Sequence, residues 1–114
     1  QTFYGTTSWD TIDNRITYSS LTTSTYTLDS FATSLTDAVH WLYSIRDGVN
    51  AETGTYMAIW DYVSSAITYT SYGSDELGET SGVTFDVDIN SDNVRFLTTI
   101  TSGSWDVKIR RLNI

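Results

Sequence analysis

The chain has 114 residues and a net charge of −8, and it contains neither cysteine nor proline. This length provides for one domain, and the absence of cysteine excludes disulfides, thiolate catalysis and Cys-ligated metal centres. The acidic charge disfavours a nucleic-acid partner, and no apolar run is long enough for a membrane span. An aromatic content of 14% indicates a folded core and not a disordered chain.

Alternation of apolar and polar residues predicts β-strands along most of the chain. Residues 1–26 are rich in Ser, Thr and Tyr, and we interpret them as an edge strand or as an arm that pairs with a neighbour. Alternation is clear at residues 38–45, whereas residues 55–60 are apolar on both faces, which predicts a central strand covered on both sides. Further alternating runs follow at residues 67–72, 83–89, 94–98 and 105–110.

Turn signals separate these runs, among them Asp47-Gly48 and Tyr72-Gly73. The spacing predicts an all-β fold, an antiparallel β-sandwich of about eight strands that is jelly-roll-like, with its domain at residues 27–114. Proteins commonly use Pro and Lys to protect strand edges, but this chain has no Pro and only Lys108. This composition favours pairing of strand edges between copies.

A series of short motifs runs through residues 27–114. It begins with Asp29-Ser30-Phe31, continues through Asp47-Gly48 and Tyr72-Gly73, and closes with Asn93-Val94-Arg95 and Trp105-Asp106-Val107-Lys108. In this order the motifs resemble a β-sandwich module of structural and fibre-type proteins of tailed bacteriophages. The resemblance implies assembly or adhesion and no catalytic chemistry.

Candidate catalytic and metal sites are weak in this sequence. Residues 86–92 have the alternate-residue spacing of a calcium loop, but Ser91 occupies the glycine position and Leu97 the position of the bidentate Glu. A solvated strand face followed by a turn is therefore the preferred interpretation, with a loose ion site as the alternative. His40 is the only histidine and has no nucleophile motif near it. We expect no catalytic residue, no metal site and no cofactor.

Candidate contact residues are aromatic or basic. Exposed Tyr and Trp side chains stack on sugars or form hot spots between proteins, and basic residues at the C-terminal end can meet an acidic patch on another copy. The first group comprises Trp9, Tyr18, Tyr26 and Tyr72, and the second comprises Lys108, Arg110 and Arg111.

These observations predict a non-enzymatic structural protein of the phage virion, such as a decoration, collar or fibre module. We expect it to form a homo-oligomer and to dock onto other virion proteins. A carbohydrate-binding or host-adhesion module at the cell surface, with a surface glycan as its ligand, is the alternative. A subunit of an extracellular filament is a weaker one.

Overall fold

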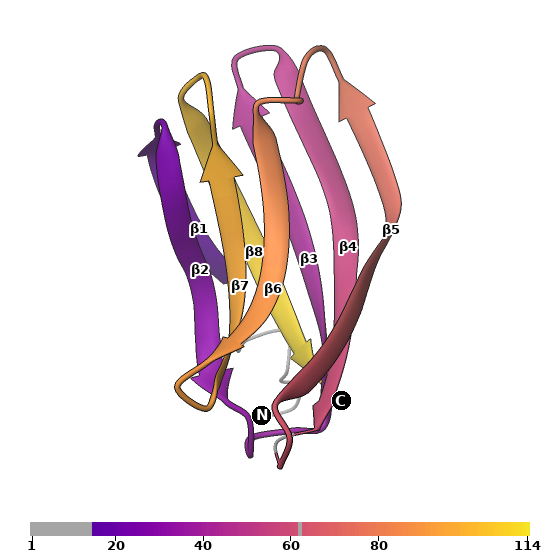
Figure 1. Ribbon diagram of the computed structural model, residues 1–114. Helices are drawn as coiled ribbons and strands as arrows, with labels where there is room; N and C mark the ends of the chain where they lie inside the picture. The colour runs from indigo at the N-terminus through magenta and orange to yellow at the C-terminus, as the bar shows by residue number, and fades with distance from the viewer. Residues whose placement is uncertain (1–14, 62) are drawn as a thin grey trace, which may run out of the picture.

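A computed structural model describes residues 15–61 and 63–114, which form eight β-strands and no helix (Figure 1). In this part of the chain, therefore, no helix has the length and apolarity needed to cross a membrane. All strand pairs are antiparallel. The strands are β1 (Arg15–Leu21), β2 (Ser24–Ala32), β3 (Ala38–Asp47), β4 (Asn50–Asp61), β5 (Ala66–Leu77), β6 (Val83–Asn90), β7 (Asn93–Ile100) and β8 (Trp105–Asn113).

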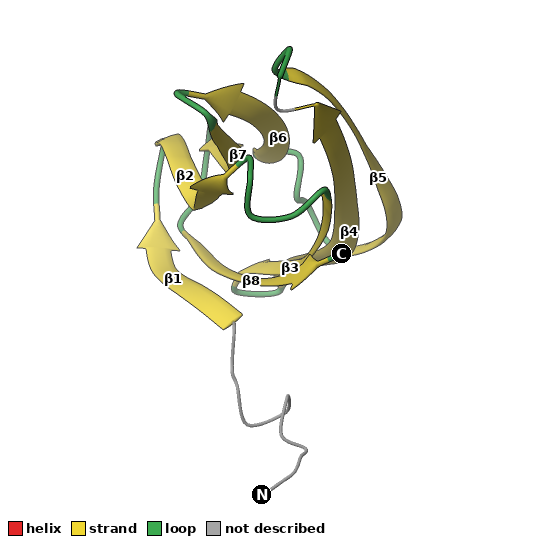
Figure 2. Ribbon diagram, turned by 90° about the horizontal axis from the view of Figure 1, so that it is seen from below, coloured by secondary structure: helices red, strands yellow, loops and turns green. Residues whose placement is uncertain are grey.

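The strands form two sheets that face each other across the core. The larger sheet has the order β1-β8-β3-β4-β5, and the smaller has the order β2-β7-β6 (Figure 2). The pairing of the first strands with the last, β1 with β8 and β2 with β7, is jelly-roll-like, whereas β3, β4 and β5 form a meander. The predicted all-β antiparallel sandwich is confirmed.

The core lies between the two sheets and is rich in aromatic rings. Trp41 of β3 stacks on Phe96 of β7, with ring centroids 4.7 Å apart and planes within 9°. Phe85 of β6 stacks on the same Phe96 ring at 5.4 Å. Each of these side chains points inward because successive residues of a strand face opposite sides of the sheet. The alternation in the sequence thus defines the core.

The two sheets differ in width, and β5 lies at the uncovered edge of the larger one. Nearly all of its residues are exposed. The neighbouring strand β4 corrects the prediction made for residues 55–60. Met57 and Ile59 point away from the smaller sheet, and Ile59 is 56% exposed. This strand is central in its sheet but covered on one face only, because residues 15–61 and 63–114 form no layer over the outer face.

The segment 15–26 contributes to both sheets. β1 pairs with β8, with Ile16 opposite Ile109, so within the chain it is an edge strand of the larger sheet. β2 begins at Ser24 and pairs with β7. Alternation did not identify β2, because hydroxyl side chains occupy most of its positions. Residues 1–14 of the proposed arm lie outside the described residues, and the domain boundary at residue 27 stays a prediction.

Truncation of the central ring should destabilise the fold far more than truncation of an exposed one. Phe96→Ala is expected to lower the free energy of unfolding by about 3–5 kcal/mol, because Phe96 is fully buried. The matched control Tyr72→Ala removes a ring that is 49% exposed and should cost less than about 1 kcal/mol. Urea unfolding followed by Trp fluorescence measures both, and equal losses would contradict this account of the core.

Candidate functional site

The outer face of the larger sheet, the face turned away from the smaller sheet, carries an exposed apolar patch. Strand register places His40 of β3 between Met57 of β4 and Leu112 of β8. Leu42 lies two residues further along β3, and Ile59 two residues further along β4. We define the apolar patch as Leu42, Met57, Ile59 and Leu112, all of which are exposed. Adjacent exposed apolar side chains of this kind mark interaction surfaces.

A basic strip borders the apolar patch on the same face. Arg15 of β1 lies directly opposite Arg110 of β8, and Lys108 lies opposite Thr17 and Ser44. We define the basic strip as Arg15, Lys108 and Arg110. These are three of only six basic residues in a chain with a net charge of −8. The strip thus concentrates half of the basic residues on one face of an acidic chain.

The outer face is shallowly hollowed at these places. One depression of about 220 Å³ is lined by the three residues of the basic strip and by Leu42. A second, also of about 220 Å³, has mainly apolar walls that include His40, Met57 and Ile59. The T-shaped contact of His40 with Tyr72, at 6.4 Å between ring centroids, lies beside it. Shallow hollows of this size suit side chains of a docking partner better than an enclosed small molecule.

Arg111 is separated from Lys108 and Arg110 by the direction of its side chain. It points inward and forms an ion pair with Asp29 at 3.2 Å, while its guanidinium lies 4.6 Å from the centre of the Phe31 ring. The Asp29 side chain is only 7% exposed and also accepts a hydrogen bond of 2.9 Å from Trp41 Nε1. Arg111 thus joins β8 to β2. The basic residues on the outer face are Arg15, Lys108 and Arg110.

A larger depression of about 470 Å³ lies at the turn end of β3 and β4, and acidic residues line it, Glu52, Asp75, Glu76 and Asp106 among them. Glu52 is engaged at both oxygens, since Oε2 accepts from the Tyr43 hydroxyl at 2.6 Å and Oε1 from the Thr80 hydroxyl at 2.7 Å. Burial, followed by this bond to Glu52, raises the pKa of Tyr43 far above its usual value. Tyr43 therefore stays a hydrogen-bond donor, and the Glu52 carboxylate is held in place by its partners.

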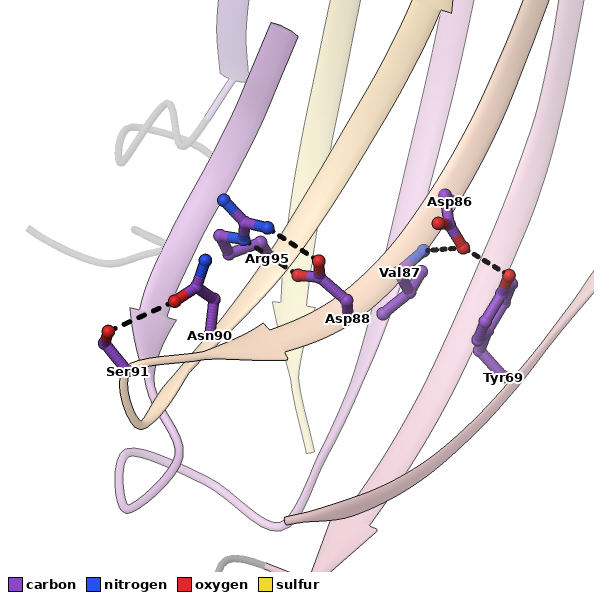
Figure 3. A network of polar contacts seen from close by, with 7 residues as sticks. All are labelled: Tyr69, Asp86, Val87, Asp88, Asn90, Ser91 and Arg95. Atoms are coloured by element: carbon purple, nitrogen blue, oxygen red, sulfur yellow. Dashed lines mark hydrogen bonds and ion pairs between the residues drawn. The ribbon is translucent and has the colours of Figure 1, made fainter. Parts of the chain in front are cut away.

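The acidic residues of the β6–β7 hairpin do not converge on one point (Figure 3). Asp86 accepts hydrogen bonds from the Tyr69 hydroxyl and from the Val87 amide. Asp88 forms a bidentate pair with Arg95, with distances of 2.8 and 2.6 Å. No group of three metal-ligating side chains occurs in residues 15–61 and 63–114. In this geometry the carboxylates serve as partners of Tyr69 and Arg95.

Of the predicted aromatic contact residues, only Tyr72 is strongly exposed in the described part of the chain. Tyr18 and Tyr26 pack against the core, and their hydroxyls donate to the carbonyls of Leu28 at 2.6 Å and Thr22 at 2.9 Å. Trp9 lies outside the described residues. Sequence reasoning missed the apolar patch. The run of apolar residues at 55–60, which does not alternate, contains two of its members, Met57 and Ile59, and could have indicated them.

Comparison with known proteins identified structures with a similar fold but no protein family. No protein-family model and no curated protein matches the chain. The tailspike protein of Acinetobacter phage vB_ApiP_P1 is similar in structure, with a TM-score of 0.56 and 19% identity over 88% of this chain. The tailspike of Acinetobacter baumannii phage AM24 aligns with 87% of this chain at 8% identity and a TM-score of 0.46.

The chain spans only 21% of the first tailspike's length and 25% of the second's. At this identity the first likeness shows only that this chain shares its fold with the aligned part of that tailspike. It agrees coarsely with the resemblance to phage structural and fibre-type modules seen in the sequence motifs.

Loss of the nearly buried Asp29 carboxylate should lower the free energy of unfolding more than loss of a more exposed carboxylate. Asp29→Asn removes the ion pair with Arg111 and is expected to lower the free energy of unfolding by about 2–3 kcal/mol. Asp88→Asn is the matched control, and it should cost clearly less because the side chains of Asp88 and Arg95 are 38% and 28% exposed. Urea denaturation at neutral pH compares the two, and an equal effect would contradict the structural role of Asp29.

Proposed function

We propose that the protein is a non-enzymatic structural or adhesion module of a bacteriophage tail, carried in the virion, that acts by self-association and by docking onto other virion proteins. The observation that carries this proposal is the outer face of the larger sheet. There a sandwich with the fold of part of a phage tailspike presents an exposed apolar patch beside a basic strip.

The chemistry of the outer face favours contact with a protein surface. Leu42, Met57, Ile59 and Leu112 can lose apolar area to a partner, which is the main favourable contribution to association. Lys108 and Arg110 at the border of the patch would orient an acidic partner and speed its approach. A mixed surface of this kind, apolar at the centre and polar at the rim, is the usual anatomy of a protein interface.

The arrangement of carboxylates supports a binding role over catalysis. A glycoside hydrolase needs two carboxyl groups that face the same bond from opposite sides. In the acidic depression, Glu52 is bonded at both oxygens to Tyr43 and Thr80, so contacts within the protein account for the position of its carboxylate. The depressions on the outer face are shallow and offer no enclosed site for a bound sugar ring.

Attachment to the virion should depend on the basic strip. In phage that carry Lys108→Gln with Arg110→Gln, we expect incorporation of the protein into particles to fall several-fold, because the partner loses two charge contacts. The control Thr25→Glu with Thr84→Glu changes the net charge equally on the exposed outer side of the smaller sheet. Immunogold labelling and mass spectrometry of purified particles provide the measurement. Absence of the wild-type protein from the tail would overturn the proposed function.

A carbohydrate-binding or host-adhesion role is the second candidate, and the exposure of Tyr72 beside His40 favours it. A half-exposed ring at the rim of an apolar depression can stack on a sugar. Titration with host surface polysaccharides, followed by NMR of the Tyr72 ring, tests this role. Shifts confined to Tyr72 and His40 would support it, and an unchanged spectrum across the panel would exclude Tyr72 as the contact.

A further inference from the structure

The free edge of β5 differs from the other sheet edges among the described residues. Among the described residues, the backbone of β5 is hydrogen-bonded to β4 on one side only, while the Tyr69 hydroxyl reaches Asp86 of β6 in the smaller sheet. From Ala66 to Tyr72 it stays in continuous register with β4, and the register shift occurs only beyond Tyr72, next to Gly73 with its φ of +68°. Along these seven extended residues, the backbone donors and acceptors that face away from β4 have no partner strand in the described part of the chain.

The other three edges carry features that discourage pairing with a foreign strand. β1 begins with Arg15 and has a register shift between Tyr18 and Leu21. β2 has a register shift between Thr27 and Asp29, and β6 carries charged Asp86 and Asp88. Bulges and charges are the usual means by which edges avoid association. Residues 66–72 contain no charge, no proline and no bulge, and they have the β-branched and aromatic composition of a strongly pairing strand.

We propose that the free edge of β5 pairs with β5 of a second copy of this chain, in antiparallel orientation, so that the two five-stranded sheets become continuous. The segment is self-complementary, since an uncharged strand of Thr, Tyr and Ser residues can face itself without a like-charge contact. An antiparallel pair related by a two-fold axis repeats each cross-strand contact twice. Thr68 and Thr70, which lie on the outer face, would then face threonine side chains of the second copy.

The acidic end of the strand determines the orientation. Asp75 and Glu76 follow the bulge at the C-terminal end of β5. Parallel pairing would place these carboxylates of the two copies side by side, which is unfavourable in a sheet. Antiparallel pairing places them at opposite ends of the joint strand pair. It also brings the apolar patches of both copies onto one extended outer face, since Met57 and Ile59 are on the strand next to β5.

The salt dependence of association distinguishes β5 pairing from docking through the basic strip. Two copies of charge −8 repel each other, so higher ionic strength should strengthen β5 pairing by screening that repulsion. A contact between the basic strip and an acidic partner should weaken under the same change. The inference rests on the proposed function only in that both include self-association.

A pair of variants with nearly the same local sequence tests the proposal. Thr68 lies in Thr68-Tyr69-Thr70 of β5, and Thr25 lies in Thr25-Tyr26-Thr27 of β2, an edge strand of the smaller sheet. Both threonines are exposed. Thr68→Glu and Thr25→Glu therefore add the same charge at an edge of each sheet, and urea unfolding confirms that each variant is folded.

Sedimentation velocity of the full chain over a range of concentrations and salt gives the result. We expect a wild-type dimer that strengthens with salt, a dissociation constant about tenfold higher for Thr68→Glu, and no change for Thr25→Glu. Hydrogen exchange should show concentration-dependent protection of amides in residues 66–72. A wild-type monomer at all concentrations, equal effects of the two variants, or unprotected β5 amides would overturn the proposal. Presence of the protein in the phage tail would be unaffected by that outcome, so the proposed function is judged separately.

Discussion

A three-stranded sheet can cover only part of a five-stranded one, and this difference in width determines which residues of the larger sheet are buried. Trp41 and Phe96 stack where the two sheets overlap, and the apolar faces of β3, β7 and β8 meet around them. Beyond the overlap, β5 has no strand on its outer side among the described residues, and the Tyr69–Asp86 hydrogen bond links it to β6. The free edge results from this mismatch, whereas the outer face is exposed because the described chain forms no third layer.

Charge inside the sandwich serves a different purpose from charge outside it. Asp29 accepts hydrogen bonds from Trp41 and from Arg111, so one nearly buried carboxylate joins β2, β3 and β8. Glu52 does the same for Tyr43 and Thr80 at the other end of the molecule. On the outer face of the larger sheet, Arg15 and Arg110 lie directly opposite each other in the pairing of β1 with β8. The inner charges thus join strands of the fold, whereas the proposed role of Lys108 and Arg110 is contact with a partner.

The sequence predicted the fold well because a single rule, alternation, determines which residues of most strands face the core. Alternation predicted a strand at residues 38–45, and the four residues that share one face of it, Val39, Trp41, Tyr43 and Ile45, are all buried. The rule failed at β2, where hydroxyl side chains hide the alternation. It also misread residues 55–60, because an apolar residue on an uncovered face cannot be told from one beneath a second layer.

The candidate site was less predictable, since it depends on register between strands distant in the sequence. Lys108 and Arg110 could be identified along β8, but nothing in the chain order indicated that Arg15 would lie beside them. Likewise, the inward direction of Arg111 follows from alternation and separates it from Arg110. Its partner Asp29, 82 residues earlier, required the structure.

Along each strand of the larger sheet, residues that face the core alternate with residues that face outward. In β3, Trp41 and Tyr43 are fixed by the aromatic core, whereas Leu42 between them contacts no other layer of the described chain. Outward positions can therefore change over generations at little cost to folding, because substitutions at exposed sites away from special features are nearly neutral. A sandwich built in this way can exchange one binding partner for another while its interior stays the same.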